Sequence, residues 1–183
     1  MPLDPSVIEG CIKKKRKAQY MLYQHFATPM LFLCMRYCRN REEAEDVVQE
    51  AFIKIFQKIS TFRQSGSLEG WIRRIMINQA INHLKARKLV FLDTDPYQLG
   101  SRFAEEKPAE QEQPFKPEVL QKAIHELPAG YKVVFNLYVF EGYSHKEIAD
   151  ELSISENTSK SQLSRARSYL RKVLSEQKNK SNR

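Results

Sequence analysis

Cysteine is scarce in this sequence, with three among 183 residues. Because their number is odd and they form no pair of pairs, Cys11, Cys34 and Cys38 predict neither a disulfide framework nor a zinc site. Cys34 and Cys38 stand one helical turn apart, a spacing that favours burial inside a helix bundle over a reactive pair. The cysteines therefore indicate packing roles.

Long apolar runs, metal-ligand spacings and a secretion signal are missing as well. No segment approaches the roughly 18 apolar residues that a membrane span requires, and the N-terminus shows no basic stretch followed by an apolar one. We therefore expect a cytoplasmic protein with no membrane insertion. The histidines form neither a metal-ligand spacing nor a cluster with acids: His25, His83, His125 and His145. We expect no enzyme activity, no cofactor and no metal.

Positive charge is present in excess and is unevenly distributed. The formal net charge is +8 and the pI is about 9.4, which indicates a polyanionic partner. Residues 157–183 contain eight Lys or Arg and one acid, whereas residues 91–118 contain seven Asp or Glu and three Lys or Arg. The sequence thus predicts two basic bodies with an acidic strip between them.

The acidic strip indicates a linker. It contains Pro96, Pro108 and Pro114 and no sustained apolar period, so it buries too little apolar surface to offset the entropy of ordering. The alternative, a surface loop of this length within one compact domain, is rare. Helical periodicity dominates elsewhere. We predict an all-α chain of two small helical domains joined by a flexible, acidic, Pro-containing linker, with a helix-turn-helix in the second domain.

The predicted boundaries divide the chain into five segments. They are a basic N-terminal extension over 1–17, a first helical domain over 18–90, the linker over 91–116, a second helical domain over 117–176 and a basic tail over 177–183. The first domain is expected to contain helices over 18–38, 41–59 and 67–87. In the second domain, helices over 117–127 and 130–140 precede the helix-turn-helix of residues 142–174.

The helix expected over 41–59 has two unlike sides, and Asn40 is its predicted N-cap. One side carries the apolar period of a core face: Ala44, Val47, Val48, Ala51, Phe52, Ile55 and Ile59. The other side, called the acidic face below, consists of Glu42, Glu43, Asp46, Gln49 and Glu50. Phosphate would be repelled here, so the acidic face fits a protein partner and plain solubility equally well.

The helix expected over 67–87 aligns polar and aromatic side chains along one side, and the loop before it adds an aromatic ring and a cation. We call this set the Trp/Asn face: Phe62, Arg63, Trp71, Arg74, Asn78, Asn82 and Lys85. Aromatic rings stack on bases, amides read base edges and cations pair with phosphates, so this face suits a single strand with an extruded base. Alternatively, Trp71 is the large aromatic residue of the bundle core.

Residues 142–174 predict two helices joined by a tight turn. Ser144 and Glu147 make a capping box for the first helix, and Ser155 caps the second. Opposite its apolar stripe, the second helix carries donors and cations: Asn157, Lys160, Ser161, Ser164, Arg165, Ser168 and Lys172. Such a helix suits the major groove of duplex DNA, and a merely solvated basic helix is the alternative.

Three segments resemble those of bacterial RNA polymerase sigma factors in their order and spacing. They are AEDVVQEAF at 44–52, WIRRIMINQAIN at 71–82 and SKSQLSRAR at 159–167. The resemblance is to the small, two-domain extracytoplasmic-function (ECF) group of the sigma-70 family, and it covers roughly residues 18–90 and 117–176. It implies a promoter-specificity subunit, monomeric when free, that binds core RNA polymerase and promoter DNA in duplex and single-stranded form. It also implies a possible anti-sigma partner.

The resemblance assigns roles to residues. It implies that Asp46, Gln49 and Glu50 dock on core polymerase and that the Trp/Asn face melts and captures the minus 10 element. It also implies that the minus 35 element is read by a set that we call the recognition face: Asn157, Thr158, Lys160, Ser161, Gln162, Ser164 and Arg165. Ser159 departs from the family pattern, which has an apolar residue at this packed position, so we expect a slightly altered tilt of the recognition helix. The competing interpretation is a stand-alone repressor or response-regulator output module whose upstream helices dimerise, which needs a self-complementary apolar face that the sequence does not show.

Overall fold

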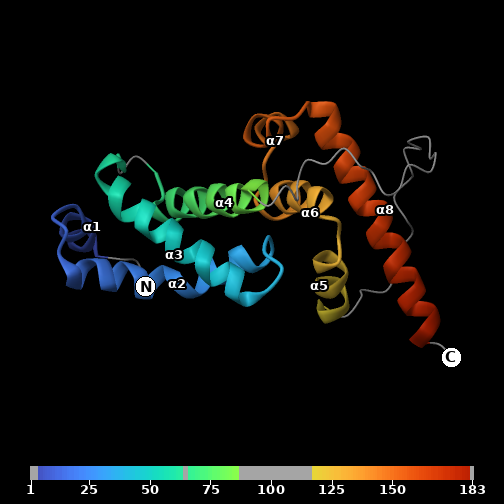
Figure 1. Cartoon of the computed structure of the whole chain (residues 1–183), viewed down its shortest axis with the longest axis horizontal. Helices are drawn as coiled ribbons and strands as arrows, with labels where there is room; N and C mark the ends of the chain where they lie inside the picture. Colours follow the sequence, from blue (N-terminus) through green and yellow to red (C-terminus); the bar gives the residue numbers. More distant parts are fainter. Residues whose placement is uncertain (1–3, 64–65, 87–116, 182–183) are drawn as a thin grey trace. The chain divides into compact units, whose positions relative to one another are not determined.

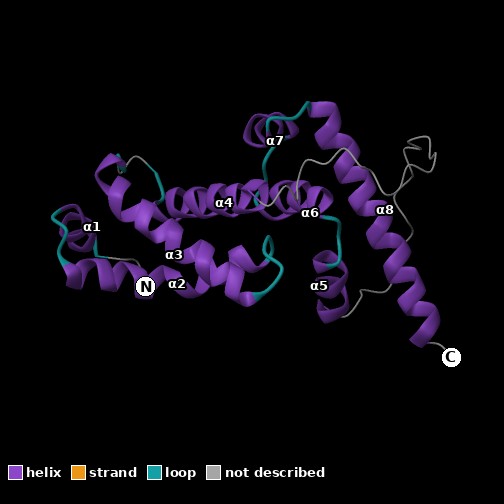
Figure 2. Cartoon of the chain, in the orientation of Figure 1, coloured by secondary structure: helices purple, strands orange, loops and turns teal. Residues whose placement is uncertain are grey.

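The structure is a computed structural model that describes residues 4–63, 66–86 and 117–181. These residues form helices, turns and loops without a strand (Figure 1, Figure 2). The chain divides into two compact units, Met1–Arg87 and Lys88–Arg183. The all-α prediction is confirmed, and the linker predicted over 91–116 lies outside the described residues. The described part of the chain holds no helix with the length and apolar character that a membrane span requires.

The first unit is a helix bundle with α2 at its centre. It contains α1 (Pro5–Ile12), α2 (Arg16–Met35), α3 (Arg41–Lys58), a short 3-10 helix η1 (Ile59–Thr61) and α4 (Leu68–Ala86). Helix α2 packs against α1, α3 and α4, and α3 also packs against α4. The core face predicted over 41–59 is buried at every position. Asn40 caps α3 as predicted, because its side chain accepts a hydrogen bond from the Glu43 N–H at 2.9 Å.

Helix α1 was not expected, because the sequence predicts only a basic extension there. Asp4 caps it by accepting a hydrogen bond from the N–H two residues on, at 2.8 Å. Val7 and Cys11 are buried against the bundle. An added Cβ at Gly10 would lie 2.5 Å from the Ala18 Cβ, so glycine is required for the close approach of α1 to α2. The apolar period of α1 is short and a basic run follows it, so the sequence pattern does not reveal this helix.

The cysteines are buried in the first unit, which confirms their predicted packing roles. Cys34, near the end of α2, is 0% exposed. Burial raises the pKa of the Cys34 thiol to about 12; the neighbouring Cys38 adds to this effect and Arg36 opposes it. The Cys34 thiol is therefore protonated at neutral pH.

We expect native Cys34 to resist alkylation. Only the thiolate is nucleophilic, and a pKa of about 12 in place of 9.0 lowers the thiolate fraction at pH 8 by roughly 1,000-fold. Iodoacetamide labelling followed by peptide mass spectrometry measures the rate in the native chain and in urea, where burial is lost. Equal rates in the two conditions would contradict the buried position of Cys34.

The second unit is organised around its long last helix. It contains α5 (Pro117–His125), α6 (Ala129–Phe135), η2 (Asn136–Phe140), α7 (His145–Leu152) and α8 (Glu156–Ser181). Helix α8 packs against α5, α6 and α7. It continues past residue 174, where its predicted apolar stripe ends, into the segment predicted as a basic tail.

The helix predicted over 130–140 is found as two segments, because η2 is a π-helical turn. The Glu141 N–H donates to the Asn136 carbonyl, five residues back, at 3.2 Å. Tyr138, Val139 and Phe140 of this turn are 36%, 46% and 44% exposed. Over five residues, the apolar period of the sequence does not distinguish a π-helical turn from an α-helical one.

Helices α7 and α8 form the predicted helix-turn-helix. The Ser144 Oγ accepts from the Glu147 N–H at 3.2 Å, and the Glu147 carboxylate accepts from the Ser144 N–H at 2.8 Å, which is the predicted capping box. Helix α7 ends at Leu152 and is followed by its C-cap Ser153, whose φ of 58° is left-handed. The Ser155 Oγ then accepts from the Thr158 N–H at 3.0 Å and starts α8. Both predicted caps are confirmed.

Candidate nucleic-acid and protein interfaces

The acidic face lies on α3, and the three residues expected to dock on polymerase are all exposed there: Asp46, Gln49 and Glu50. Glu43 is used differently. Its carboxylate accepts from the Arg39 N–H at 3.2 Å and lies 3.8 Å from His83 Nε2 of α4. Glu43 therefore supports the start of α3, while Asp46 and Glu50 carry negative charge outward.

A buried amide holds Glu50 in place. The side chain of Gln79, on α4, is 6% exposed; its Nε2 donates to the Glu50 carboxylate, and its Oε1 accepts from Lys54 Nζ. An unpaired buried amide would cost about 1–3 kcal/mol, so these partners stabilise the packing of α4 on α3. The sequence did not reveal Gln79 as a partner of Glu50, because the two residues lie on different helices.

The Trp/Asn face combines the loop after α3 with one side of α4. Its exposed members are Arg63, Arg74 and Asn82, and its half-buried members are Phe62, Trp71, Asn78 and Lys85. The rings of Phe62 and Trp71 have centroids 5.6 Å apart and planes at 46°, so loop and helix meet through an aromatic pair. Trp71 is half-buried and contacts Phe62 of the loop, so it is not the fully buried core aromatic of the alternative interpretation.

The recognition face occupies the first three turns of α8. Its exposed members are Asn157, Lys160, Ser164 and Arg165, and its half-buried members are Thr158, Ser161 and Gln162. The Ser161 hydroxyl donates to the Thr158 carbonyl at 2.9 Å, and the Thr158 hydroxyl lies 2.9 Å from that of Ser155. These two hydroxyls therefore make hydrogen bonds within the first turns of α8. The four exposed side chains therefore present most of the outward donors and charge.

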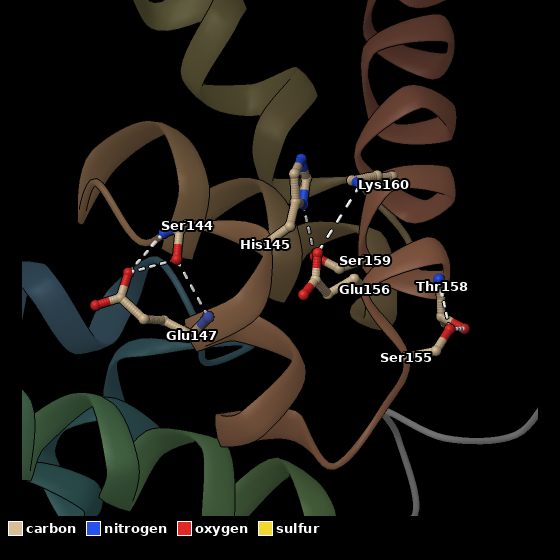
Figure 3. A network of polar contacts seen from close by, with 8 residues as sticks. All are labelled: Ser144, His145, Glu147, Ser155, Glu156, Thr158, Ser159 and Lys160. Atoms are coloured by element: carbon tan, nitrogen blue, oxygen red, sulfur yellow. Dashed lines mark hydrogen bonds and ion pairs between the residues drawn. The ribbon is translucent and has the colours of Figure 1, made fainter.

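Ser159 interrupts the recognition face because it lies on the inner side of α8. It is 0% exposed, and its hydroxyl lies 2.9 Å from Nδ1 of His145, the first residue of α7 (Figure 3). The His145 ring stacks on Tyr138 of η2, with ring centroids 4.8 Å apart. The sequence places Ser159 on the packed side but does not reveal His145 as its partner, since the two residues belong to different helices.

Two family matches cover the three surfaces. Residues 22–90 match the family described as Sigma-70 region 2, and residues 118–170 match the one described as Sigma-70, region 4. The acidic face and the Trp/Asn face lie within the first match. The recognition face lies within the second.

Relatives of known identity match nearly the whole chain. The RNA polymerase sigma-H factor of Pseudomonas aeruginosa is 31% identical over 180 residues, which span 93% of each chain. The ECF RNA polymerase sigma-E factor of Haemophilus influenzae is 28% identical over 176 residues, 91% of this chain and 93% of that one.

A solved structure shares the fold. The sigma factor RpoE from Bartonella quintana, in complex with the anti-sigma factor NepR, aligns with a TM-score of 0.54 at 23% identity. The alignment covers 85% of this chain and 96% of that one.

Proposed function

Because the chain belongs to the ECF group of the sigma-70 family of bacterial RNA polymerase sigma factors, we propose that it directs core polymerase to promoters through three surfaces of distinct chemistry. As a member of this family, it is a DNA-binding subunit of transcription initiation and acts by binding, not by catalysis. It works in the cytoplasm with its polymerase and is a monomer when free.

The observation that carries this proposal is the presence of two opposite chemistries on neighbouring, packed helices. Helix α3 exposes Asp46 and Glu50, whereas α4 exposes Arg74 and Asn82. The first pair repels phosphate and suits a basic protein surface, while the second suits a nucleic-acid strand. We therefore assign docking on core polymerase to Asp46, Gln49 and Glu50.

We assign the Trp/Asn face to the melted minus 10 element. The paired rings of Phe62 and Trp71 offer a wall for base stacking, which is worth ~1–3 kcal/mol per base. The amides of Asn78 and Asn82 read base edges, and the cations of the face pair with phosphates. Extruding a base costs a few kcal/mol, so stacking and edge contacts together are large enough to offset it.

We assign the recognition face to the minus 35 element, read in the major groove. Arg165 and Lys160 are exposed on one stretch of α8 with Asn157 and Ser164, and these side chains supply the donors that base edges and phosphates accept. Thr158, Ser161 and Gln162 complete the face at its half-buried margin.

The segments 18–90 and 117–176 then act as two DNA-binding modules joined by a tether over 91–116. Linked modules gain affinity only where both reach their sites at a compatible spacing, which the polymerase provides. The free chain therefore binds promoter DNA weakly. The RpoE structure is a complex with an anti-sigma factor, and we propose a partner of that kind for this chain.

Reconstitution with core polymerase tests the function as a whole. We expect the purified chain to make core polymerase start transcription at specific sites, which sequencing of transcript 5′ ends on genomic DNA would map. Core polymerase without the chain is the control. Tight binding of a dimer of the chain to a palindromic site without polymerase would support the repressor interpretation instead.

Arg165→Ala is expected to weaken holoenzyme binding to duplex minus 35 DNA by about 1–3 kcal/mol and to relax the preference at one base pair. Arg171→Ala, which removes the same exposed group farther along α8, is the matched control and should not change base preference. Competition binding with a set of single base-pair variants measures both effects. A uniform loss across all sequences would show that Arg165 contacts phosphate and not a base.

A further inference from the structure

Ser159 is a fully buried polar residue between two members of the recognition face, Thr158 and Lys160. Its side chain is 0% exposed, so its hydroxyl has no access to water. An unpaired hydroxyl in such a position costs about 1–3 kcal/mol. The 2.9 Å contact with His145 Nδ1 supplies the partner and joins the start of α7 to the first turn of α8 (Figure 3).

The imidazole ring is also held by an aromatic neighbour, which an arginine contacts in turn. Tyr138 stacks on it with an angle of 24° between the ring planes, and the Arg167 guanidinium lies 5.8 Å from the centroid of the Tyr138 ring. His145 therefore joins α7 to η2 and α8 at the same time. A side chain held in this way has little freedom to follow a displacement of α8.

The surroundings of the ring favour its neutral form. Burial lowers the pKa of His145, and the nearby cations Lys160 and Arg167 lower it too, while Glu156 opposes them. In a neutral imidazole one nitrogen donates and the other accepts, so Nδ1 can pair with a serine hydroxyl in either sense.

We propose that the His145–Ser159 hydrogen bond sets the position of the first turns of α8 and so determines which bases the recognition face reads. An apolar contact at this point would be non-directional and would allow a range of helix positions, whereas a hydrogen bond fixes both distance and angle. A shift of α8 by a fraction of an ångström moves all exposed donors of the recognition face together. His145 and Ser159 are thus positioning residues that act without touching DNA. The inference rests on the proposed reading of duplex DNA by this face.

Two substitutions at His145 separate the effect of the hydrogen bond from the effect of the ring. His145→Phe keeps a ring against Tyr138 and removes the polar atom, whereas His145→Asn removes the ring and keeps an amide close to the position of Nδ1. Ser159→Ala removes the other partner. Each variant is assembled into holoenzyme and bound to duplex DNA randomised over the minus 35 element, and the bound fraction is sequenced. Thermal melting of the same preparations reports the stability of each variant.

We expect His145→Phe and Ser159→Ala to lower the preference for the best sequence over its single base-pair variants by roughly three- to tenfold at several positions. This loss is smaller than the discrimination that a good direct base contact can supply. His145→Asn should retain the wild-type preference. The double variant with His145→Phe and Ser159→Ala should show the same loss of preference as either of these single variants, because the two changes remove the same hydrogen bond. Preference is a ratio between sequences, so a lower melting temperature alone does not change it.

Three results would overturn the inference. An unchanged preference in both His145→Phe and Ser159→Ala would reduce the pair to a stability element. Equal losses in His145→Phe and His145→Asn would show that no polar atom at this position restores the preference. If wild-type holoenzyme itself selected no sequence at minus 35, the proposed function of the recognition face would fail, and this inference with it.

Discussion

Asp46→Arg is expected to weaken binding of the chain to core RNA polymerase by roughly 30-fold, about 2 kcal/mol, because it places a cation where the polymerase would present its own. Asp46 is exposed on α3, so the fold should tolerate the change. Titration of the fluorescently labelled chain with core polymerase measures the affinity. Thermal melting of the variant checks that it is folded.

Glu9→Arg is the matched control for Asp46→Arg. It makes the same change of charge on α1, where the Glu9 carboxylate lies 4.0 Å from Lys13 Nζ in an exposed pair of small energetic value. Similar losses in the two variants would mean that net charge matters and that Asp46 has no docking role. Glu50→Arg is a less specific probe, because the Glu50 carboxylate also accepts from the buried Gln79.

Asn78→Ala combined with Asn82→Ala is expected to weaken holoenzyme binding to promoter DNA opened over the minus 10 element by roughly 30- to 1,000-fold. This corresponds to about 1–2 kcal/mol for each lost amide contact. Binding to the closed duplex should change little, because the bases are then stacked and paired. Promoter fragments with and without mismatches over the minus 10 element supply the two substrates.

Gln24→Ala, which removes an exposed amide from α2, is the control for the two asparagine changes and should affect neither substrate. Trp71→Ala should reproduce the loss on opened DNA, but it also removes the contact with Phe62. Trp71→Phe keeps an aromatic ring there and separates stacking from packing. If the double asparagine variant lost the same affinity for opened and closed DNA, base capture by the Trp/Asn face would be wrong.

The features that the sequence predicted correctly are those encoded locally. The core face over 41–59 follows from apolar spacing along one helix, and the caps at Asn40, Ser144 and Ser155 each depend on residues within three positions. The exposure of Asp46 follows from the same spacing. Apolar spacing and capping chemistry were enough to predict these features, because both depend only on residues that are close in the sequence.

The features that the sequence did not reveal depend on partners distant in the chain. The bond between Gln79 and Glu50 joins two helices, as does the bond between His145 and Ser159. A polar residue on a packed side indicates that some partner exists but does not identify it. Helix α1 was missed for another reason, because its apolar period is short and a basic run follows it directly.

The π-helical turn η2 is the place in its segment where the chain can lose one residue without a change of helical phase. A π turn holds about one residue more than an α turn, so deleting one residue between Asn136 and Phe140 would restore regular α-helical geometry. A deletion inside α6 would instead remove a residue from a regular α-helix and rotate the chain that follows by about 100° about the helix axis. Tyr138 would then lose its alignment with His145. A one-residue gap in α6 would therefore displace the helix-turn-helix from the contacts that orient it, whereas a gap in η2 that spares Tyr138 would largely preserve its direction.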